Sequence, residues 1–164
     1  MNIRPGLLAL TLLLTLSGQA QAYSYAAAGK EPLIDVREAL LGAATDGKDA
    51  SATLSEIADE LAYLEQHHKV ELQAPLAAAI KAKDTAATAA LLNRAYKAEI
   101  ERRLEGDSQN LGDYQTAKVL VVKSKRFLDL ILPSLSEGDR KAADQELARV
   151  PDAIGNPGAS GLGA

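Results

Sequence analysis

Hydrophobic residues between positions 32 and 150 recur every three or four residues, which is the period of one face of an α-helix. The clearest stripe is Leu54, Ile57, Leu61 and Leu64. Nowhere do β-branched residues alternate with polar residues over a strand-length segment. The pattern therefore predicts an all-α domain over residues 32–150.

Caps and helix breakers divide this domain into six segments. Pro32 favours the first turn of a helix, Gly47 and Gly106 favour helix ends, and Pro133 and Pro151 stop a helix that reaches them. We expect helices over residues 32–46, 50–68, 75–83 and 85–105, then from Ser108 or Asn110 to Leu132, and from Ser136 or Asp139 to Val150.

A weak internal repeat affects the expected architecture. Lys48-Asp49 and Lys83-Asp84 each stand between two predicted helices, 35 residues apart. This offset is similar to that of tetratricopeptide-like arrays, but the Trp, Gly and Pro positions of that motif are absent. We expect three antiparallel helical hairpins, either closed as a small bundle or stacked as a short solenoid, with the bundle preferred.

The predicted helix that ends at Leu132 has the widest apolar coverage. Val119 to Val122 are four consecutive apolar residues, which on a helix point in all directions. A helix of this kind is either central in its domain or covered on its far side by another chain. We expect it to be central, with other helices packed around it.

The first 22 residues have the three-part layout of a secretory signal peptide. Arg4 gives a positive start, residues 7–16 form an apolar run, and Ala20-Gln21-Ala22 is a small-x-small cleavage pattern. A membrane-spanning helix needs about 20 apolar residues, and this run has half that length. We expect Sec-type export with cleavage after Ala22, a periplasmic or secreted location and no stable membrane insertion after cleavage.

Three further segments complete the predicted organisation. Residues 23–31 form an extended lead-in, residues 32–150 the helical domain, and residues 151–164 a tail rich in Gly and Pro.

Composition excludes several kinds of chemistry. The chain has no Cys, which rules out thiol catalysis, iron–sulfur clusters and covalently attached haem. It has neither a phosphate-binding glycine loop nor a dinucleotide fingerprint. A net charge of −4 disfavours nucleic-acid binding. We expect no cofactor, no nucleic-acid partner and no enzymatic activity.

The pair His67-His68 is the most conspicuous polar feature. Glu65 and Glu71 lie close in sequence, and imidazole with carboxylate can hold zinc or another divalent ion. However, neighbouring residues on a helix diverge by about 100°, so both rings rarely reach one ion. Solvated histidines at a helix end are therefore the preferred interpretation, with a metal site of His67, His68, Glu65 and Glu71 as the alternative.

A basic set on the helix ending at Leu132 is a candidate docking strip for an acidic partner. It consists of Lys118, Lys123, Lys125 and Arg126. The alternative, which we prefer, is that these long side chains cover a broad apolar helix, with Asp129 pairing with Lys125.

These observations predict an exported, non-enzymatic helical protein that acts as an accessory or adaptor by binding another envelope protein. The alternative is a carrier of a small ligand or a divalent metal ion that uses His67, His68 and the nearby carboxylates.

Overall fold

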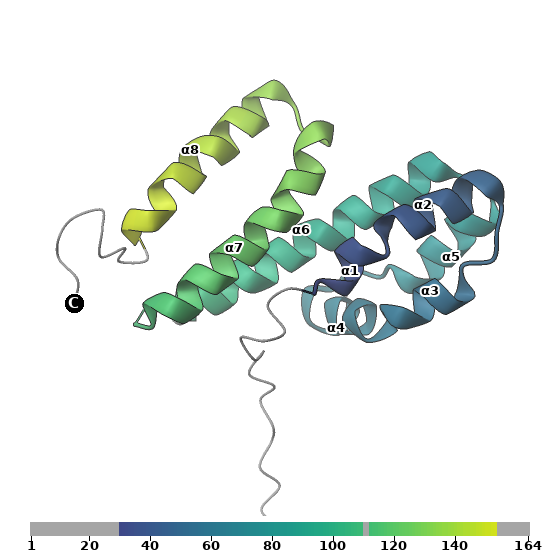
Figure 1. Ribbon diagram of the computed structural model, residues 1–164, viewed down its shortest axis with the longest axis horizontal. Coiled ribbons are helices and arrows are strands. Elements are labelled where there is room, and N and C mark those ends of the chain that lie inside the picture. The colour runs from purple at the N-terminus through teal and green to yellow at the C-terminus, as the bar shows by residue number, and fades with distance from the viewer. Residues whose placement is uncertain (1–29, 110–111, 154–164) are drawn as a thin grey trace, which may run out of the picture.

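A computed structural model of the chain describes residues 30–109 and 112–153, and over these residues it is helical with no strands, as predicted (Figure 1). The predicted signal peptide, the lead-in up to residue 29 and the tail after Ala153 lie outside the described residues. None of the described helices is long and apolar enough to cross a membrane. The elements are α1 (Pro32–Asp35), α2 (Arg37–Asp46), α3 (Ser51–Glu56), α4 (Ala58–His68), α5 (Gln73–Lys81), α6 (Thr85–Gln109), α7 (Tyr114–Ile131), the short 3₁₀ helix η2 (Leu132–Ser134) and α8 (Glu137–Ala153).

Local chemistry explains most helix boundaries. Gly47 ends α2 with φ at 71°, in the left-handed region that glycine tolerates best. The carboxylate of Asp84 accepts a 2.8 Å hydrogen bond from the backbone N–H of Ala87 in the first turn of α6. Asp113 accepts backbone hydrogen bonds from Gln115 and Thr116 and so starts α7. The prediction that Ser108 or Asn110 opens this helix was wrong, because residues 108 and 109 continue α6.

Two predicted helices are interrupted where a buried β-branched residue meets the core. Val36 separates α1 from α2, and Ile57 separates α3 from α4. The backbone N–H of Ile57 donates to Leu54 O at 3.3 Å, a tightened turn that redirects the helix. Val36 and Ile57 are 5% and 0% exposed, so these bends keep both side chains in the core.

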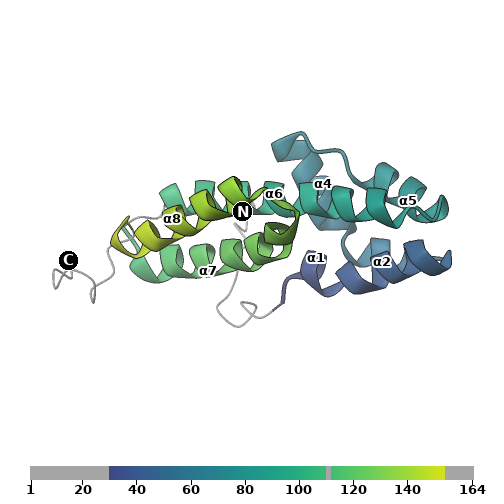
Figure 2. The same cartoon turned by 90° about the horizontal axis from the view of Figure 1, so that it is seen from above.

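The helix α6 organises the molecule. Its first part packs against α2, α4 and α5, and α7 lies along it in the antiparallel direction (Figures 1 and 2). Its buried residues include Leu92, Ala95 and Tyr96. The prediction that the helix ending at Leu132 is central was therefore wrong, since α6 holds this place and α7 packs chiefly on α6 and η2.

The two linkers of the weak repeat lie side by side. The end of the Lys83 side chain lies directly against Gly47, where a Cβ would stand, and the hydroxyls of Thr45 and Thr85 are 3.1 Å apart. The α2–α3 and α5–α6 turns are therefore at the same end of the molecule.

The core is formed mainly by the residues before α7. Leu40, Leu61, Leu64 and Leu72 are almost completely buried, together with Tyr96. From α7, Phe127 and Ile131 join this core. Of the predicted stripe, Ile57, Leu61 and Leu64 are buried and Leu54 is half-buried.

The last helix is attached loosely. None of the side chains described in α8 is buried, and Ala143, Leu147 and Val150 are half-buried. It also extends to Ala153, so the prediction that Pro151 ends this helix was wrong; the end lies two residues further on, within the usual spread of helix termini.

Candidate functional site

A cluster of charged residues is buried where α1, α6 and α7 meet. The charge cluster comprises Glu31, Glu99, Arg102, Arg103 and Lys123. Four of its side chains are at most 7% exposed, and Arg102 is 21% exposed. Charged side chains are rarely buried to this degree unless they are paired, so the cluster needs a structural or functional reason.

Glu31 is the point at which the cluster ties the start of α1 to the rest of the chain. Arg103 Nη2 donates a 2.5 Å hydrogen bond to Glu31 Oε2, and Lys123 Nζ lies 3.1 Å from Glu31 Oε1. One carboxylate thus connects side chains from α6 and α7.

Glu99 connects the two arginines of α6. Arg102 donates from Nε and Nη2 to Glu99 Oε2, at 3.2 and 2.8 Å. Arg103 also forms an ion pair with Glu99 and donates from Nη1 to its backbone oxygen at 3.2 Å. Glu99 is therefore paired with both arginines, at spacings of three and four residues along α6.

Aromatic rings cover the two guanidinium groups. Arg103 lies 4.5 Å from the centre of the Phe127 ring, and Arg102 lies 5.2 Å from that of Tyr63. The negative face of an aromatic ring attracts a cation, and this attraction grows where water is excluded.

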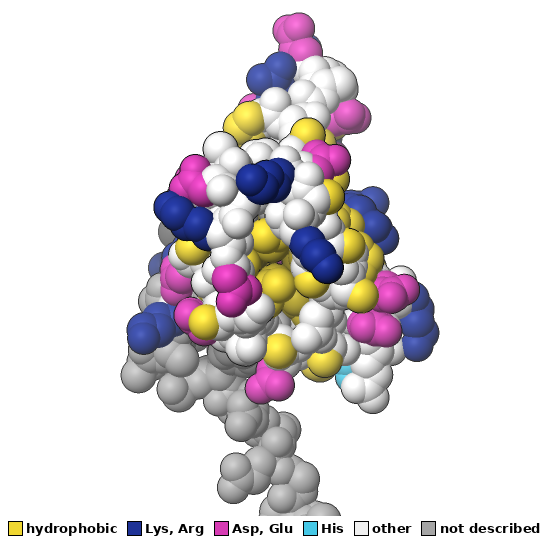
Figure 3. All heavy atoms as spheres, turned by 90° about the vertical axis from the view of Figure 1, so that its right-hand side faces the viewer, with side chains coloured by type: hydrophobic (Ala, Val, Ile, Leu, Met, Phe, Trp, Pro, Cys, Tyr) yellow, Lys and Arg dark blue, Asp and Glu magenta, His cyan; other side chains and the backbone are white. Residues whose placement is uncertain are grey.

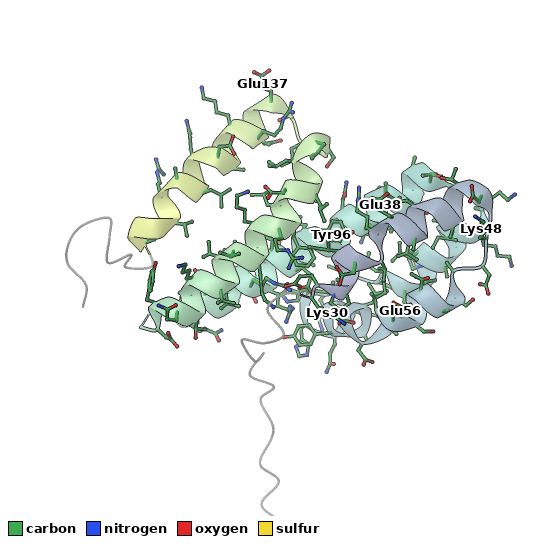
Figure 4. All side chains as sticks on the ribbon, in the orientation of Figure 1. Lys30, Glu38, Lys48, Glu56, Tyr96 and Glu137 are labelled. Carbon is green, nitrogen blue, oxygen red and sulfur yellow. The ribbon has the colours of Figure 1, made fainter. Side chains whose placement is uncertain are left out.

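A cavity of about 170 Å³ opens beside the charge cluster. Figure 4 shows Lys30 and Tyr96 in the region where α1, α6 and α7 come together. The side chains around the cavity combine both signs of charge with an apolar surface, but include no Ser, Thr, Cys or His that could act as an activated nucleophile. They are Lys30, Glu31, Pro32, Leu33, Glu60, Glu99, Arg102, Arg103 and Phe127.

Asp107 continues the buried charged face of α6, four residues after Arg103. It is 9% exposed, and among the described residues no donor reaches its Oδ1. Burial raises the pKa of the Asp107 carboxyl above its ordinary value.

The predicted metal ligands at the end of α4 are not gathered into a site. Glu65, His67 and Glu71 are exposed, and His68 is half-buried. The ring of His67 stacks on Tyr63 with 4.3 Å between the centres. Within the described residues, no three His, Cys, Asp or Glu side chains are placed to hold a metal ion.

The predicted basic strip is divided between different environments. Lys123 is buried against Glu31, and Lys125 forms an exposed ion pair with Asp129 at 2.7 Å. Lys118 is exposed and lies 5.9 Å from the centre of the Tyr114 ring, and Arg126 is half-buried. The four cations therefore do not form one exposed strip.

The C-terminal arm, which we define as α7, η2 and α8, holds many apolar side chains at its surface. Val122 is 54% exposed, the largest exposed fraction among the large hydrophobic residues described. Val119 lies one turn before Val122 and is half-buried. Further half-buried apolar residues of the arm are Leu120, Val121, Leu128, Leu130, Leu132, Leu135, Ala143, Leu147 and Val150.

A second hollow lies at the opposite end of the molecule. Figure 3 faces this end and shows hydrophobic side chains within a hollow bordered by charged groups. Its apolar side chains include Leu54, Ala77 and Ile80, with Lys48 and Lys81 also in its wall. Ile80 is already buried in the core, so much of this apolar surface is the edge of the core itself.

Sequence reasoning missed Glu31, Glu99, Arg103 and Asp107 as buried groups. A signal was present, because Leu92, Tyr96, Glu99, Arg103 and Asp107 continue one helical stripe from apolar into charged residues. Leu104, an apolar residue of the same helix, is instead 46% exposed.

Comparison with protein-family models, with curated proteins and with solved structures finds no match to this chain.

Proposed function

We propose that the chain is an exported, non-enzymatic accessory protein that binds another envelope protein through the C-terminal arm. The observation that carries this proposal is the apolar surface around Val122, on an arm whose last helix buries none of its described side chains. Exposed apolar side chains that lie close together mark protein-binding sites.

The chemistry of the arm defines the partner. Val119 and Val122 lie one turn apart on α7, with the exposed Lys118 and Lys125 on the neighbouring turns and Lys125 paired with Asp129. A partner therefore gains binding energy mainly by burying apolar area, and an amphipathic helix that presents its own apolar stripe fits this requirement. An acidic partner, which was the less favoured interpretation of the basic set, has little support because Lys123 is buried and Lys125 is paired with Asp129.

Export is the second part of the proposal. It rests on the charged start, the apolar run and the small-x-small pattern of residues 1–22. Intact-mass measurement of the protein from an envelope fraction tests it. A chain beginning at Tyr23 agrees with the proposal, and a mass that still includes residues 7–16 contradicts it.

Site-specific photo-crosslinking in the native host tests the binding function. A photoreactive residue at position 122 should crosslink to one defined protein, because this side chain lies within the proposed interface. The control position is Glu38 of α2, whose side chain is 90% exposed. The same product from both positions, or no protein product from position 122, would contradict the proposal.

A further inference from the structure

We propose that the hollow at the end of the molecule where the α2–α3 and α5–α6 turns meet binds a free medium-chain aliphatic carboxylate. This site is separate from the surface around Val122 and does not depend on the function proposed for that surface. The hollow lies between the end of α2, α3 and α5, and Figure 3 faces it.

The hollow has the size and the apolar wall of a ligand site. Its volume of about 430 Å³ falls within the range of small-molecule sites, which is about 300–1,000 Å³. Ala77 is exposed and Leu54 is half-buried, so the apolar wall extends outward from the core residue Ile80 to surface that a ligand can cover. Among the described residues of this wall there is no aromatic ring, and an aliphatic chain suits it.

Two ammonium groups without partners stand at this hollow. Lys81 belongs to its wall from the last turn of α5, and Lys83 follows directly after that helix. Both residues are exposed, and within the described part of the chain neither ammonium group forms a hydrogen bond or an ion pair. A ligand can therefore bind them without breaking an existing interaction.

The ammonium group of Lys83 lies at the edge of the hollow. The backbone of Lys83 has φ at 57°, in the left-handed region that residues other than glycine adopt at some cost. Its Nζ lies against Gly47, 2.7 Å from the place where a Cβ would stand. Since Gly47 is part of the wall of the hollow, this conformation places a positive charge beside the apolar surface.

The charges around the hollow favour an anion over a cation. Three carboxylates at this end are engaged locally: Asp46 pairs with Lys48, while Asp49 and Asp84 accept hydrogen bonds from backbone N–H groups of the helices that follow them. In this part of the described structure, the two unpaired ammonium groups are left for a ligand, and they attract a carboxylate. A carboxylate joined to an aliphatic chain matches both the cations and the apolar wall.

Amide chemical shifts of the purified, isotope-labelled protein test this proposal. Sodium octanoate is titrated up to about 10 mM, where a ligand with a dissociation constant of about 1 mM is nearly saturated. It should shift the amides of Gly47, Leu54 and Lys81 along a saturable curve. No shift of these amides, or shifts around Val122 alone, would overturn the proposal.

Two analogues test the two parts of the ligand. Acetate keeps the carboxylate but lacks the chain, and octylamine keeps the chain but carries a positive charge. Each should bind at least about tenfold more weakly than octanoate, because acetate loses the apolar contact and octylamine is repelled by the lysines. If acetate binds as well as octanoate, the site is selective only for an anion, and equal binding of octylamine would reduce it to an apolar patch. Either result would overturn the assignment.

Two neighbouring alanines of α5 provide a matched pair of variants for the apolar wall. Ala77 is in the wall of the hollow, whereas Ala78 is not, and both are exposed. Ala77→Phe should weaken octanoate binding about tenfold because the ring occupies the hollow, while Ala78→Phe should leave it unchanged. Equal affinities of the two variants would contradict the proposed location.

A second matched pair tests the charge. Lys81→Glu should weaken octanoate binding about tenfold, because repulsion replaces attraction. Lys141→Glu changes the net charge equally at an exposed position of α8 and should have no effect. Unchanged affinity in folded Lys81→Glu would overturn the role of the lysines. If Lys81→Glu does not fold, the shift map and the analogues still decide the proposal on the unaltered protein.

Discussion

Arg103 on α6 donates a 2.5 Å hydrogen bond to Glu31, a residue 72 positions earlier in the chain. Glu31 immediately precedes α1, so this contact fixes the start of the first helix against the longest helix of the structure. Lys123 of α7 reaches the same carboxylate. The contact therefore holds three separate segments of the fold together.

Arg103→Ala should destabilise the protein by about 3–5 kcal/mol. The substitution removes one of the two cationic partners of each buried carboxylate, Glu31 and Glu99, and removing one partner of a buried ion pair is strongly destabilising. Urea denaturation monitored by circular dichroism measures the change in free energy of unfolding.

The matched control is Lys125→Ala, which removes an exposed ion pair with Asp129. An exposed pair of this spacing contributes about 0.3–0.5 kcal/mol. If both substitutions lower the free energy of unfolding equally, the buried charge cluster does not hold these segments of the fold together.

Leucine substitutions compare a core position with a surface position. Leu61 is 1% exposed in α4, and Leu104 is 46% exposed in α6. Leu61→Ala should cost about 2–5 kcal/mol because it leaves a cavity in the core. Leu104→Ala should cost much less. A larger loss for Leu104 in the same denaturation experiment would contradict the described packing of α6.

Asp107 predicts a specific pH dependence. Burial raises the pKa of the Asp107 carboxyl in the folded state above its ordinary value, so the folded state holds this proton more tightly than the unfolded chain does. Its contribution to stability is therefore most favourable below the unfolded pKa and is lost as pH rises through the raised folded pKa.

Asn cannot ionise, so Asp107→Asn should abolish the loss of stability that accompanies ionisation of this carboxyl. At neutral pH it should stabilise the protein by up to about 1 kcal/mol. The measurement is the difference in unfolding free energy between variant and unaltered protein across an acidic to neutral pH series. Asp113→Asn is the control with the opposite sign, because hydrogen bonds from Thr116 hold the pKa of Asp113 below its usual value. A pH-independent difference for Asp107→Asn would refute the raised pKa.

Zinc should leave the melting temperature nearly unchanged. The four predicted ligands at the end of α4 are not assembled within the described structure, and His67 is stacked on Tyr63. A bound ion at 100 times its dissociation constant would add about 2.7 kcal/mol of stability, which a thermal melt detects easily. A large shift that disappears in the His67→Ala, His68→Ala double variant would restore the metal-carrier alternative.

The sequence predicted helical content and most helix positions because these depend on local spacing, caps and breakers. The stripe of Leu61 and Leu64 is one example, and the turn at Gly47 is another. The placement of the long helices depends instead on which of their faces pack against other helices. The apolar run Val119–Val122 gives no indication in sequence of which side of the helix is covered. In the structure α7 packs against α6, and Val122 remains exposed.

The charge cluster was harder to predict for a related reason. Glu99, Arg102 and Arg103 are spaced like an ordinary solvent-exposed set of helix pairs. Their burial arises because Glu31 and Lys123 arrive from distant parts of the chain. Helix periodicity contains no information about such long-range neighbours.

The central claim is that the apolar surface around Val122 binds another protein. The measurement that tests it most directly is the affinity of the partner captured at position 122 for three forms of the chain: unaltered, Val122→Asp and Leu104→Asp. Val122→Asp should remain folded, because its side chain is 54% exposed, but should bind at least about tenfold more weakly. Leu104→Asp, at a similarly exposed position on α6, should bind as the unaltered protein does. A folded Val122→Asp protein that keeps full affinity would contradict the account.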